Sequence, residues 1–316
     1  MSIRQYSYVL NMPIELRHLR YFIAVAEEGH ITRAAERIGM QQPPLSQQIK
    51  ALETQVGAKL FLRKPRGVVL TEAGRTFLAD AREVFSGLDR AIETTRRAAR
   101  GEQGRICVGV TPTAPFNPLV PQVIRVFRDS FPLVALTVEE GFSNDLLRLQ
   151  HDRVDVAFIR NRVANTEGLT VTPLADEPMV VALPSRHELA RADVGEAMLM
   201  KCLARESFIL YGPPGSGIYD ATIAACHQAG FGPRVSQLAP RITSTLGLVA
   251  AGLGISLVPE SMCCVRLDGV SYRRLKGAVQ PRAVLNLVSR RGDPSGVVGH
   301  FLHTVNEQRG KQMSSC

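Results

Sequence analysis

The sequence predicts an α/β protein that begins with an all-α winged helix-turn-helix domain. Three observations predict this fold class. Two short amphipathic helices separated by Gly39-Met40 precede a basic hairpin at 60–70. A long helical segment over 72–100 contains no proline. From Arg105 onward, continuous apolar runs alternate with helical patterns, which is typical of βαβ units around a parallel sheet.

Length and charge narrow the range of partners. A chain of 316 residues suggests two or three domains, and a formal net charge of +9 with a pI of about 9.6 favours an anionic partner. Residues 1–105 contain 17 Lys and Arg against 11 Asp and Glu, whereas the remaining residues contain 21 against 18. The positive charge is therefore concentrated beside the helix-turn-helix, where a nucleic acid would bind.

The cysteines and the hydropathy pattern argue against other classes of protein. None of the six cysteines forms a C-x-x-C pair or a metal-ligand spacing, so we expect reduced thiols, no metal and no cofactor in a cytoplasmic protein. His300 and His303 are three residues apart, but no third ligand is nearby in the sequence. No run of 18 apolar residues occurs, and we expect neither a signal peptide nor contact with a membrane.

The helix-turn-helix is predicted from apolar spacing over 31–56. The first helix repeats its apolar residues at helical spacing over 31–38, and the second begins at Pro43-Pro44, where missing amide hydrogens cost little. The inward stripe of the second helix is Leu45, Ile49, Leu52 and Val56. Its other face is polar, which suits base edges in the major groove. A polar face is often only a solvated surface, but the order of helix, turn, Pro-Pro helix and basic hairpin is more specific.

The candidate DNA-contacting residues lie on these helices and on the hairpin, which would form the wing. Those assigned to the two helices are Thr32, Gln42, Pro43, Pro44, Ser46, Gln47 and Lys50. Those assigned to the wing are Arg63, Lys64 and Arg66. Amide, hydroxyl and ammonium groups of the second helix would read bases, and the wing cations would contact phosphates or the minor groove.

The segment 72–100 is predicted to be one long helix that pairs with the same helix of a second subunit. Its apolar positions form a heptad seam, namely Phe77, Ala81, Val84, Leu88, Ala91 and Ala98. A small wing could not bury so long a stripe, although a lone amphipathic linker is the alternative. Gly101-Glu102-Gln103-Gly104 then ends the helix and would serve as a hinge.

These segments together resemble the LysR-type transcriptional regulators, and the aromatic-acid-sensing members most closely. The N-terminal residues that resemble the family are Leu16-Arg17-His18-Leu19-Arg20-Tyr21-Phe22, Thr32-x-Ala34-Ala35, Gln42-Pro43-Pro44-Leu45-Ser46-x-Gln48-Ile49, Leu52-Glu53, Leu60-Phe61-x-Arg63 and Leu70-Thr71-x-Ala73-Gly74. The chain departs from the family at His30, where a capping Ser is usual, and at Gln47, where those sensors often carry Arg. Cys202 and Cys226 do not match the cysteine spacing of the peroxide-sensing branch.

The C-terminal half resembles the effector domain of that family, which has a two-lobed fold similar to periplasmic binding proteins. The matching segments are Gly109-Val110-Thr111, 154–158 and 246–259. The expected organisation is a flexible extension (1–12), a winged helix-turn-helix domain (13–71), a dimerising helix with hinge (72–104) and an effector-binding domain (105–316). Within the last, we expect lobe I at about 106–173 and 276–316, and lobe II at about 174–275.

An effector site is expected where strands end and helices begin, because free amides and hydroxyls gather there. Thr111 and Thr113 follow the first strand, Ser143 begins a helix expected at 144–150, and Ser216 follows a strand of the second lobe. Thr243 begins a further helix. The resemblance adds Pro213 and Arg160 to this site and supports Thr111, Ser143 and Thr243. Each hydroxyl could instead be an ordinary helix cap, and Arg160 could be a surface arginine. Their convergence, without a cluster of Asp or Glu, favours a small organic anion such as a carboxylate.

Signals for an enzyme are weak. Gly215-Ser216-Gly217 is not a G-x-S-x-G elbow, and Gly252-Leu253-Gly254 lacks the third glycine of a dinucleotide loop. The sequence therefore predicts no enzyme, but a bacterial regulator that binds double-stranded DNA and is switched by a small organic anion. The resemblance further implies a homotetramer built from such dimers and contact with RNA polymerase. The alternative is a plain binding module, or a small-molecule enzyme, with an incidental N-terminal domain.

Overall fold

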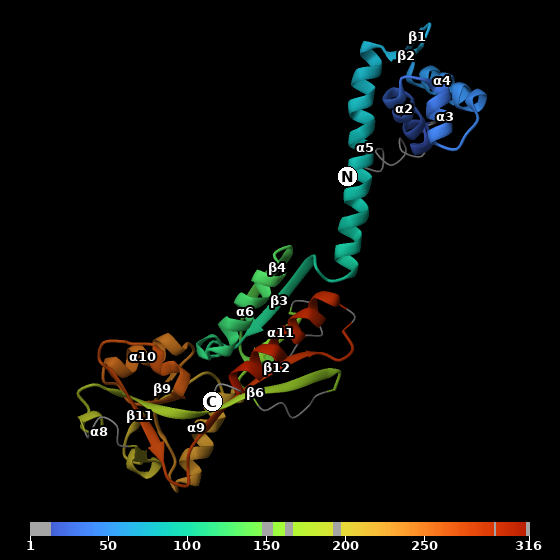
Figure 1. Cartoon of the computed structure of the whole chain (residues 1–316). Coiled ribbons are helices and arrows are strands. Elements are labelled where there is room, and N and C mark those ends of the chain that lie inside the picture. Colours follow the sequence, from blue (N-terminus) through green and yellow to red (C-terminus); the bar gives the residue numbers. More distant parts are fainter. Residues whose placement is uncertain (1–13, 147–153, 162–166, 192–196, 294, 314–316) are drawn as a thin grey trace. The chain divides into compact units, whose positions relative to one another are not determined.

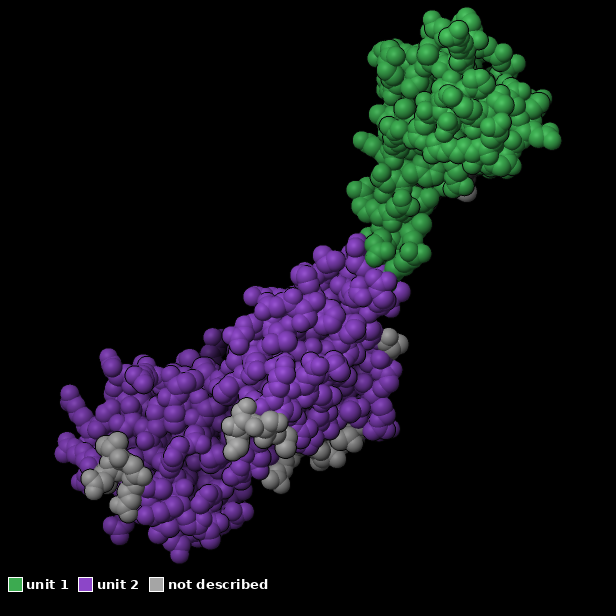
Figure 2. All heavy atoms as spheres, in the orientation of Figure 1, with its two compact units in different colours: residues 1–96 green, residues 97–316 purple. Residues whose placement is uncertain are grey.

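The computed structural model describes residues 14–146, 154–161, 167–191, 197–293 and 295–313. The expected extension at 1–12 and most of the helix expected at 144–150 lie outside these residues. The chain divides into two compact units, residues 1–96 and 97–316 (Figure 2).

Unit 1 contains the predicted helix-turn-helix and wing (Figure 1). Its elements are α2 (Leu16–Glu28), α3 (Ile31–Arg37), α4 (Gln42–Val56), β1 (Phe61–Lys64) and β2 (Gly67–Leu70). α2 ends because Gly29 adopts φ 58°, a left-handed conformation that glycine adopts without strain. The inward stripes meet in one core, in which Phe22, Leu45 and Leu60 are fully buried. The expectation of two helices, a turn and a hairpin is confirmed.

The long helix α5 (Glu72–Ala99) uses its apolar residues in two different ways. Near its start, Phe77 and Ala81 pack into the core of unit 1, so they are not free to pair with another helix. Farther along, Val84, Leu88 and Ile92 are 46%, 37% and 42% exposed. The continuous seam expected from Phe77 onward is therefore wrong at its beginning, since the helix-turn-helix core uses those positions.

The first half of unit 2 builds one end of a large mixed sheet. Its elements are β3 (Gly104–Val110), η1 (Ala114–Phe116), α6 (Leu119–Ser130), β4 (Val134–Glu140), α7 (Ser143–Leu146), β5 (Val156–Ile159) and the long β6 (Leu169–Pro184). β3 lies parallel to β4 and β5, as βαβ units require. Helices α6 and α11 (Gly296–Met313) cover this lobe around a core that includes Phe127, Phe158 and Phe301.

The remaining elements build the second lobe and the strand β12, which returns to the first. They are α8 (Glu188–Arg191), β7 (Met198–Leu199), η3 (Met200–Leu203), β8 (Ser207–Tyr211), α9 (Gly217–Gln228), β9 (Arg234–Ala239), α10 (Ile242–Ala250), β10 (Ser256–Pro259), η4 (Glu260–Cys264), β11 (Val270–Lys276) and β12 (Arg282–Arg290). The large sheet has the order β4-β3-β5-β12-β6-β11-β7, and β10 also pairs with β6. β6 and β12 therefore pass from one lobe to the other.

Three strands differ from the sequence-based expectation. The sequence predicts a strand only over 179–183, because Pro173, Pro178 and charged residues interrupt the apolar pattern in the first half of β6. β9 and β11 were missed because both are largely polar, and most of β9 is exposed. β6 tolerates Pro173 and Pro178 because this half of the strand pairs only with β12 among the described strands, so its other edge requires no amide donor. As a consequence, local sequence patterns do not predict the acidic residues Asp176 and Glu177 that β6 brings to the centre of unit 2.

Candidate DNA-binding surface and effector cavity

The polar face of α4 is largely exposed. Pro43, Pro44, Gln47 and Lys50 are exposed, while Gln42 and Ser46 are half-buried at the same helix face. Leu45, Ile49 and Leu52 hold the opposite face in the core. The helix therefore presents amide, hydroxyl and ammonium groups on a rigid element, as base recognition requires.

The wing is fixed to the helices at a glycine. The Val68 amide donates to the Gly29 carbonyl at 2.8 Å. A Cβ on Gly67, whose φ is 137°, would lie 2.3 Å from that same carbonyl oxygen, so only glycine fits there. Arg63, Lys64 and Arg66 are all exposed on the hairpin. The three predicted wing cations are thus held out from unit 1 on one short ribbon.

Glu53 is an anchor that the sequence reasoning did not single out. Its carboxylate is buried and accepts from the amides of Leu60 at 2.9 Å and Phe61 at 3.2 Å, while Lys59 pairs with it at 2.8 Å. Burial raises the pKa of Glu53. Lys59 and the two amides lower the pKa by more than burial raises it, so the pKa of Glu53 lies below its ordinary value. Glu53 thereby fastens the end of α4 to the start of the wing. In the sequence, Glu53 is distinguished only as part of the family segment Leu52-Glu53.

His30 caps α3 despite not being the usual serine. The residue is extended, and its Nδ1 accepts from the Thr32 amide at 3.2 Å. Thr32 is exposed at the first turn of the same helix. An imidazole nitrogen thus supplies the acceptor that a Ser hydroxyl would supply at the start of the helix-turn-helix.

Replacing His30 with alanine should lower the free energy of unfolding of unit 1 by about 1 kcal/mol, because the Thr32 amide loses its acceptor. His30→Ser is the matched control, since its hydroxyl can cap the same amide and should preserve stability. Urea denaturation of the full chain, followed by helical circular dichroism, measures both variants. Equal destabilisation by alanine and serine would show that packing, not capping, sets the role of His30.

The candidate site, named here the effector cavity, lies where the ends of β3, β4, β5 and β8 meet the starts of α7 and α9. Its described lining comprises Thr111, Pro112, Thr113, Phe142, Ser143, Arg160, Tyr211, Ser216, Gly217 and Ile218. The volume is only about 10 Å³, close to that needed by one water molecule. The Phe142 and Tyr211 rings lie with centroids 6.3 Å apart and form an apolar wall. Burial raises the pKa of Tyr211 well above its ordinary value, so its phenol stays a neutral donor.

Close backbone contact between the lobes keeps this cavity small. A Cβ on Gly217 would lie 1.5 Å from the Arg160 carbonyl oxygen, so the start of α9 approaches the end of β5 as only glycine allows. The Asn161 amide group donates to the Gly215 carbonyl at 3.2 Å across the same gap. The two lobes therefore contact each other directly beside the cavity.

The cavity brings together five of the seven predicted effector residues. Thr111, Thr113, Ser143, Arg160 and Ser216 line it, and all five are buried. Pro213 and Thr243 do not line it, and both are exposed. Thr243 lies in the first turn of α10 and is exposed, and the N-cap of this helix is Arg241.

Arg160 is buried at the cavity and paired, which excludes the alternative of a surface arginine. It is neither a surface arginine nor a free charge, because its Nη1 lies 2.5 Å from Glu177 Oε1 on β6. Glu177 also accepts from the Ser261 amide at 2.7 Å and from Asn117 Nδ2 at 3.2 Å. Burial lowers the pKa of Arg160, and the Arg160 charge holds the pKa of Glu177 below its ordinary value against burial. Glu177 is thus a single acidic residue that lies behind Arg160 and neutralises it, and it was not assigned to the site from the sequence.

Two buried polar atoms of the cavity residues have no protein partner. These are Arg160 Nε and Ser216 Oγ. Gly212, with φ 79°, makes room for the Ser216 hydroxyl, since a Cβ there would lie 2.7 Å from its oxygen. Buried donors are almost always satisfied in folded proteins, so two of them around one cavity point to a bound acceptor.

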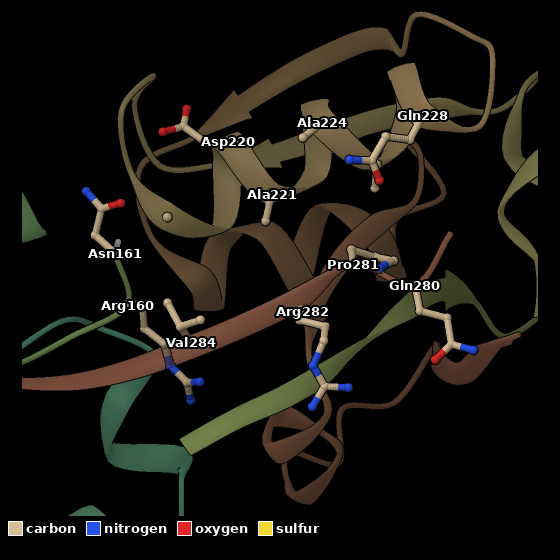
Figure 3. Close-up of a pocket in the computed structure, with 12 residues that line it drawn as sticks. Arg160, Asn161, Asp220, Ala221, Ala224, Gln228, Gln280, Pro281, Arg282 and Val284 are labelled. Atoms are coloured by element: carbon tan, nitrogen blue, oxygen red, sulfur yellow. The ribbon is translucent and has the colours of Figure 1, made fainter. Parts of the chain in front are cut away.

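A larger hollow of about 570 Å³ adjoins the cavity and shares Arg160 and Gly217 with it. Figure 3 shows Ala221 and Ala224 of α9 facing Arg282 and Val284 of β12 across this space. Its other described charged residues are Asp220 and Arg282, and Arg282 pairs with Asp176 at 3.0 Å. The hollow therefore adds no uncompensated positive charge.

Other chemistry has little support in the part of the chain that the structure describes. No group of three or more His, Cys, Asp or Glu there could hold a metal ion, and none of the described helices is long and apolar enough to cross a membrane. Burial raises the pKa of the Cys226 thiol to about 11, which is opposite to a reactive thiol.

Comparison with known proteins decides the family. Residues 16–75 match the bacterial regulatory helix-turn-helix protein of the lysR family, and residues 99–310 match the LysR substrate binding domain. The chain belongs to the LysR family of transcriptional regulators. The expectation of a regulator rather than an enzyme is confirmed, since its relatives are named as regulators.

Individual LysR proteins are similar over most of the chain. The regulator BudR of Raoultella terrigena is 36% identical over 292 residues, covering 92% of this chain and 99% of BudR. The uncharacterized regulator YnfL of Escherichia coli strain K12 is 40% identical over 263 residues, covering 83% of this chain and 87% of YnfL. Full-length CbnR complexed with its target DNA superposes with a TM-score of 0.80 at 27% identity, covering 94% of this chain and 100% of CbnR. The two-domain LysR architecture, with DNA-binding and effector-binding parts, is thus confirmed.

Proposed function

We propose that this LysR regulator is switched by a small organic anion, a carboxylate, bound in the effector cavity. The cavity has room for about one water molecule, so the lobes would move apart to admit the anion. The observation that supports the proposal is the convergence of the Thr111, Ser143 and Ser216 hydroxyls with Arg160 on one buried space. A carboxylate accepts several hydrogen bonds, and charge-assisted ones are the stronger kind. Phe142 and Tyr211 would contact a ring or short chain, which suits an aromatic acid better than a sugar.

The DNA-binding half of the proposal assigns base reading to α4. Gln42, Ser46, Gln47 and Lys50 would enter the major groove, and the wing cations would contact phosphate or the minor groove. The regulator would act in the cytoplasm, on double-stranded DNA and with RNA polymerase.

Assembly is proposed to occur through α5. The exposed side chains of Val84, Leu88 and Ile92 are spaced four residues apart, so they form one apolar stripe along the helix. A second copy of α5 would cover this stripe, and effector domains would join two such dimers into a tetramer. Because the effector would sit between the lobes, its binding would bias their orientation and, through α5, the spacing of the DNA-binding domains.

The test of this function is Ser143→Ala. Thermal-shift screening of the full chain against small carboxylates first selects the one that stabilises it most. The variant should bind that carboxylate at least about tenfold more weakly, having lost a buried donor, and its operator binding should no longer respond to it.

The matched control is Ser244→Ala, which removes an exposed hydroxyl from α10. It should leave both affinity and response unchanged. A normal response in the Ser143 variant, or a screen in which only cations and neutral compounds bind, would contradict the proposed site.

A further inference from the structure

We infer that the effector is a monocarboxylate, and that Glu177 is the residue that excludes dicarboxylates. This inference rests on the proposed function, since it specifies the charge of the anion in the same cavity. Its starting point is the pairing of Arg160, which is the one charged residue among the described residues of the cavity lining.

The positive charge of Arg160 is already neutralised by the protein. Glu177 Oε1 lies 2.5 Å from Nη1, and Glu177 is itself fixed by Asn117 and the Ser261 amide. The guanidinium also donates to the carbonyls of Ala283 at 3.4 Å and Thr113 at 3.3 Å. Both Nη groups are thus engaged, and Glu177 cannot turn away without breaking contacts to two other elements.

Two hydrogen-bond donors remain available to a ligand. Arg160 Nε and Ser216 Oγ are buried without a partner, and Ser216 is only 8% exposed. Thr111 Oγ1 already lies 3.4 Å from the Phe158 carbonyl oxygen, and the Tyr211 phenol is neutral. One carboxylate group can accept from the two free donors, with Ser143 beside them.

A second carboxylate would find no unpaired cation among the described neighbours. In the adjoining hollow, Arg282 pairs with Asp176, and Asp220 adds negative charge. Burying a second anion near Glu177 would therefore cost desolvation and repulsion without compensation. The cavity consequently selects by charge, because it has donors for one carboxylate and no counter-charge for a second among its described residues.

The inference is tested by calorimetric titration of the full chain with matched acids. The probes are butyrate against succinate and benzoate against terephthalate, which differ mainly in the second carboxylate. For each pair in which binding is detected, the wild-type chain should bind the monoacid about tenfold or more tightly than the diacid. Glu177→Gln keeps the side-chain shape but frees the Arg160 charge, so this preference should fall by about tenfold, chiefly through tighter dicarboxylate binding.

Glu206→Gln is the control, because it removes a carboxylate from the half-buried pair with His187 elsewhere in the second lobe. It should leave the preference intact. A wild-type chain that binds the diacid as tightly as the monoacid overturns the inference while the proposed anion site stands. An unchanged preference in a folded Glu177→Gln variant overturns the role of Glu177. If none of the four acids binds, both the inference and the proposed carboxylate site fail.

Discussion

Replacing Arg160 with methionine is expected to lower the free energy of unfolding of unit 2 by about 3–5 kcal/mol. The reason is that Glu177 would stay largely buried without its cation, held by Asn117 and Ser261. Removing one partner of a buried pair costs far more than the pair itself contributes, because the remaining charge has no water and no counter-charge. Urea denaturation of the full chain, with a probe specific to unit 2, measures the change.

Arg282→Met supplies the matched comparison. Arg282 on β12 pairs with Asp176, which precedes Glu177 on β6, but the two side chains are 44% and 51% exposed. Exposed pairs contribute at most about 1 kcal/mol, because water solvates the charge that is left behind. Equal losses from the two methionine substitutions would contradict the assignment of Arg160 and Glu177 as a buried pair.

Replacing Val84 and Leu88 with aspartate is expected to dissociate the proposed α5 pair into monomers or into effector-domain dimers. Both residues lie in the exposed part of α5, so the change should not disturb the core of unit 1. Two buried apolar contacts per helix would be replaced by like charges facing each other across the seam, which opposes association at low salt. Light scattering of the full chain should therefore show at least a halving of the mass.

The control for this experiment is Ala79→Asp. At about 3.6 residues per turn, Ala79 lies on the opposite side of α5 from the Val84–Leu88 stripe, and it is exposed. It should leave the assembly unchanged. An intact assembly in the Val84 and Leu88 double variant would show that another surface joins the subunits.

The local elements of this chain could be predicted because their sequence periodicity is strong. The stripe of Leu45, Ile49 and Leu52 determines which face of α4 is buried. Gly39 lies in the turn before the helix, and Gly57 is its C-cap. The buried strand β5 is a continuous apolar run with a polar residue immediately after it. In both cases the residues that decide the structure lie within one short window.

The centre of the effector site could not be predicted in the same way. The partners of Arg160 are Glu177 and Ser261, which are 17 and 101 residues distant from it in sequence. The crossing strand β6 brings Glu177 to Arg160. Nothing local distinguishes Glu177 from an exposed acidic residue, since Pro178 follows it and obscures the strand. The sequence located the donors of the cavity but not the group that neutralises their charge.

The most direct measurement of the central claim is fluorescence anisotropy of the full chain on its upstream DNA and on random DNA, with and without the selected carboxylate. The wild-type chain should prefer the upstream DNA, and the carboxylate should change that binding. Gln47→Ala should reduce discrimination by about 1–3 kcal/mol while random-DNA binding persists, because Gln47 is exposed on the base-reading face. Equal affinity of the wild-type chain for both DNAs, unaffected by carboxylate, would contradict the account.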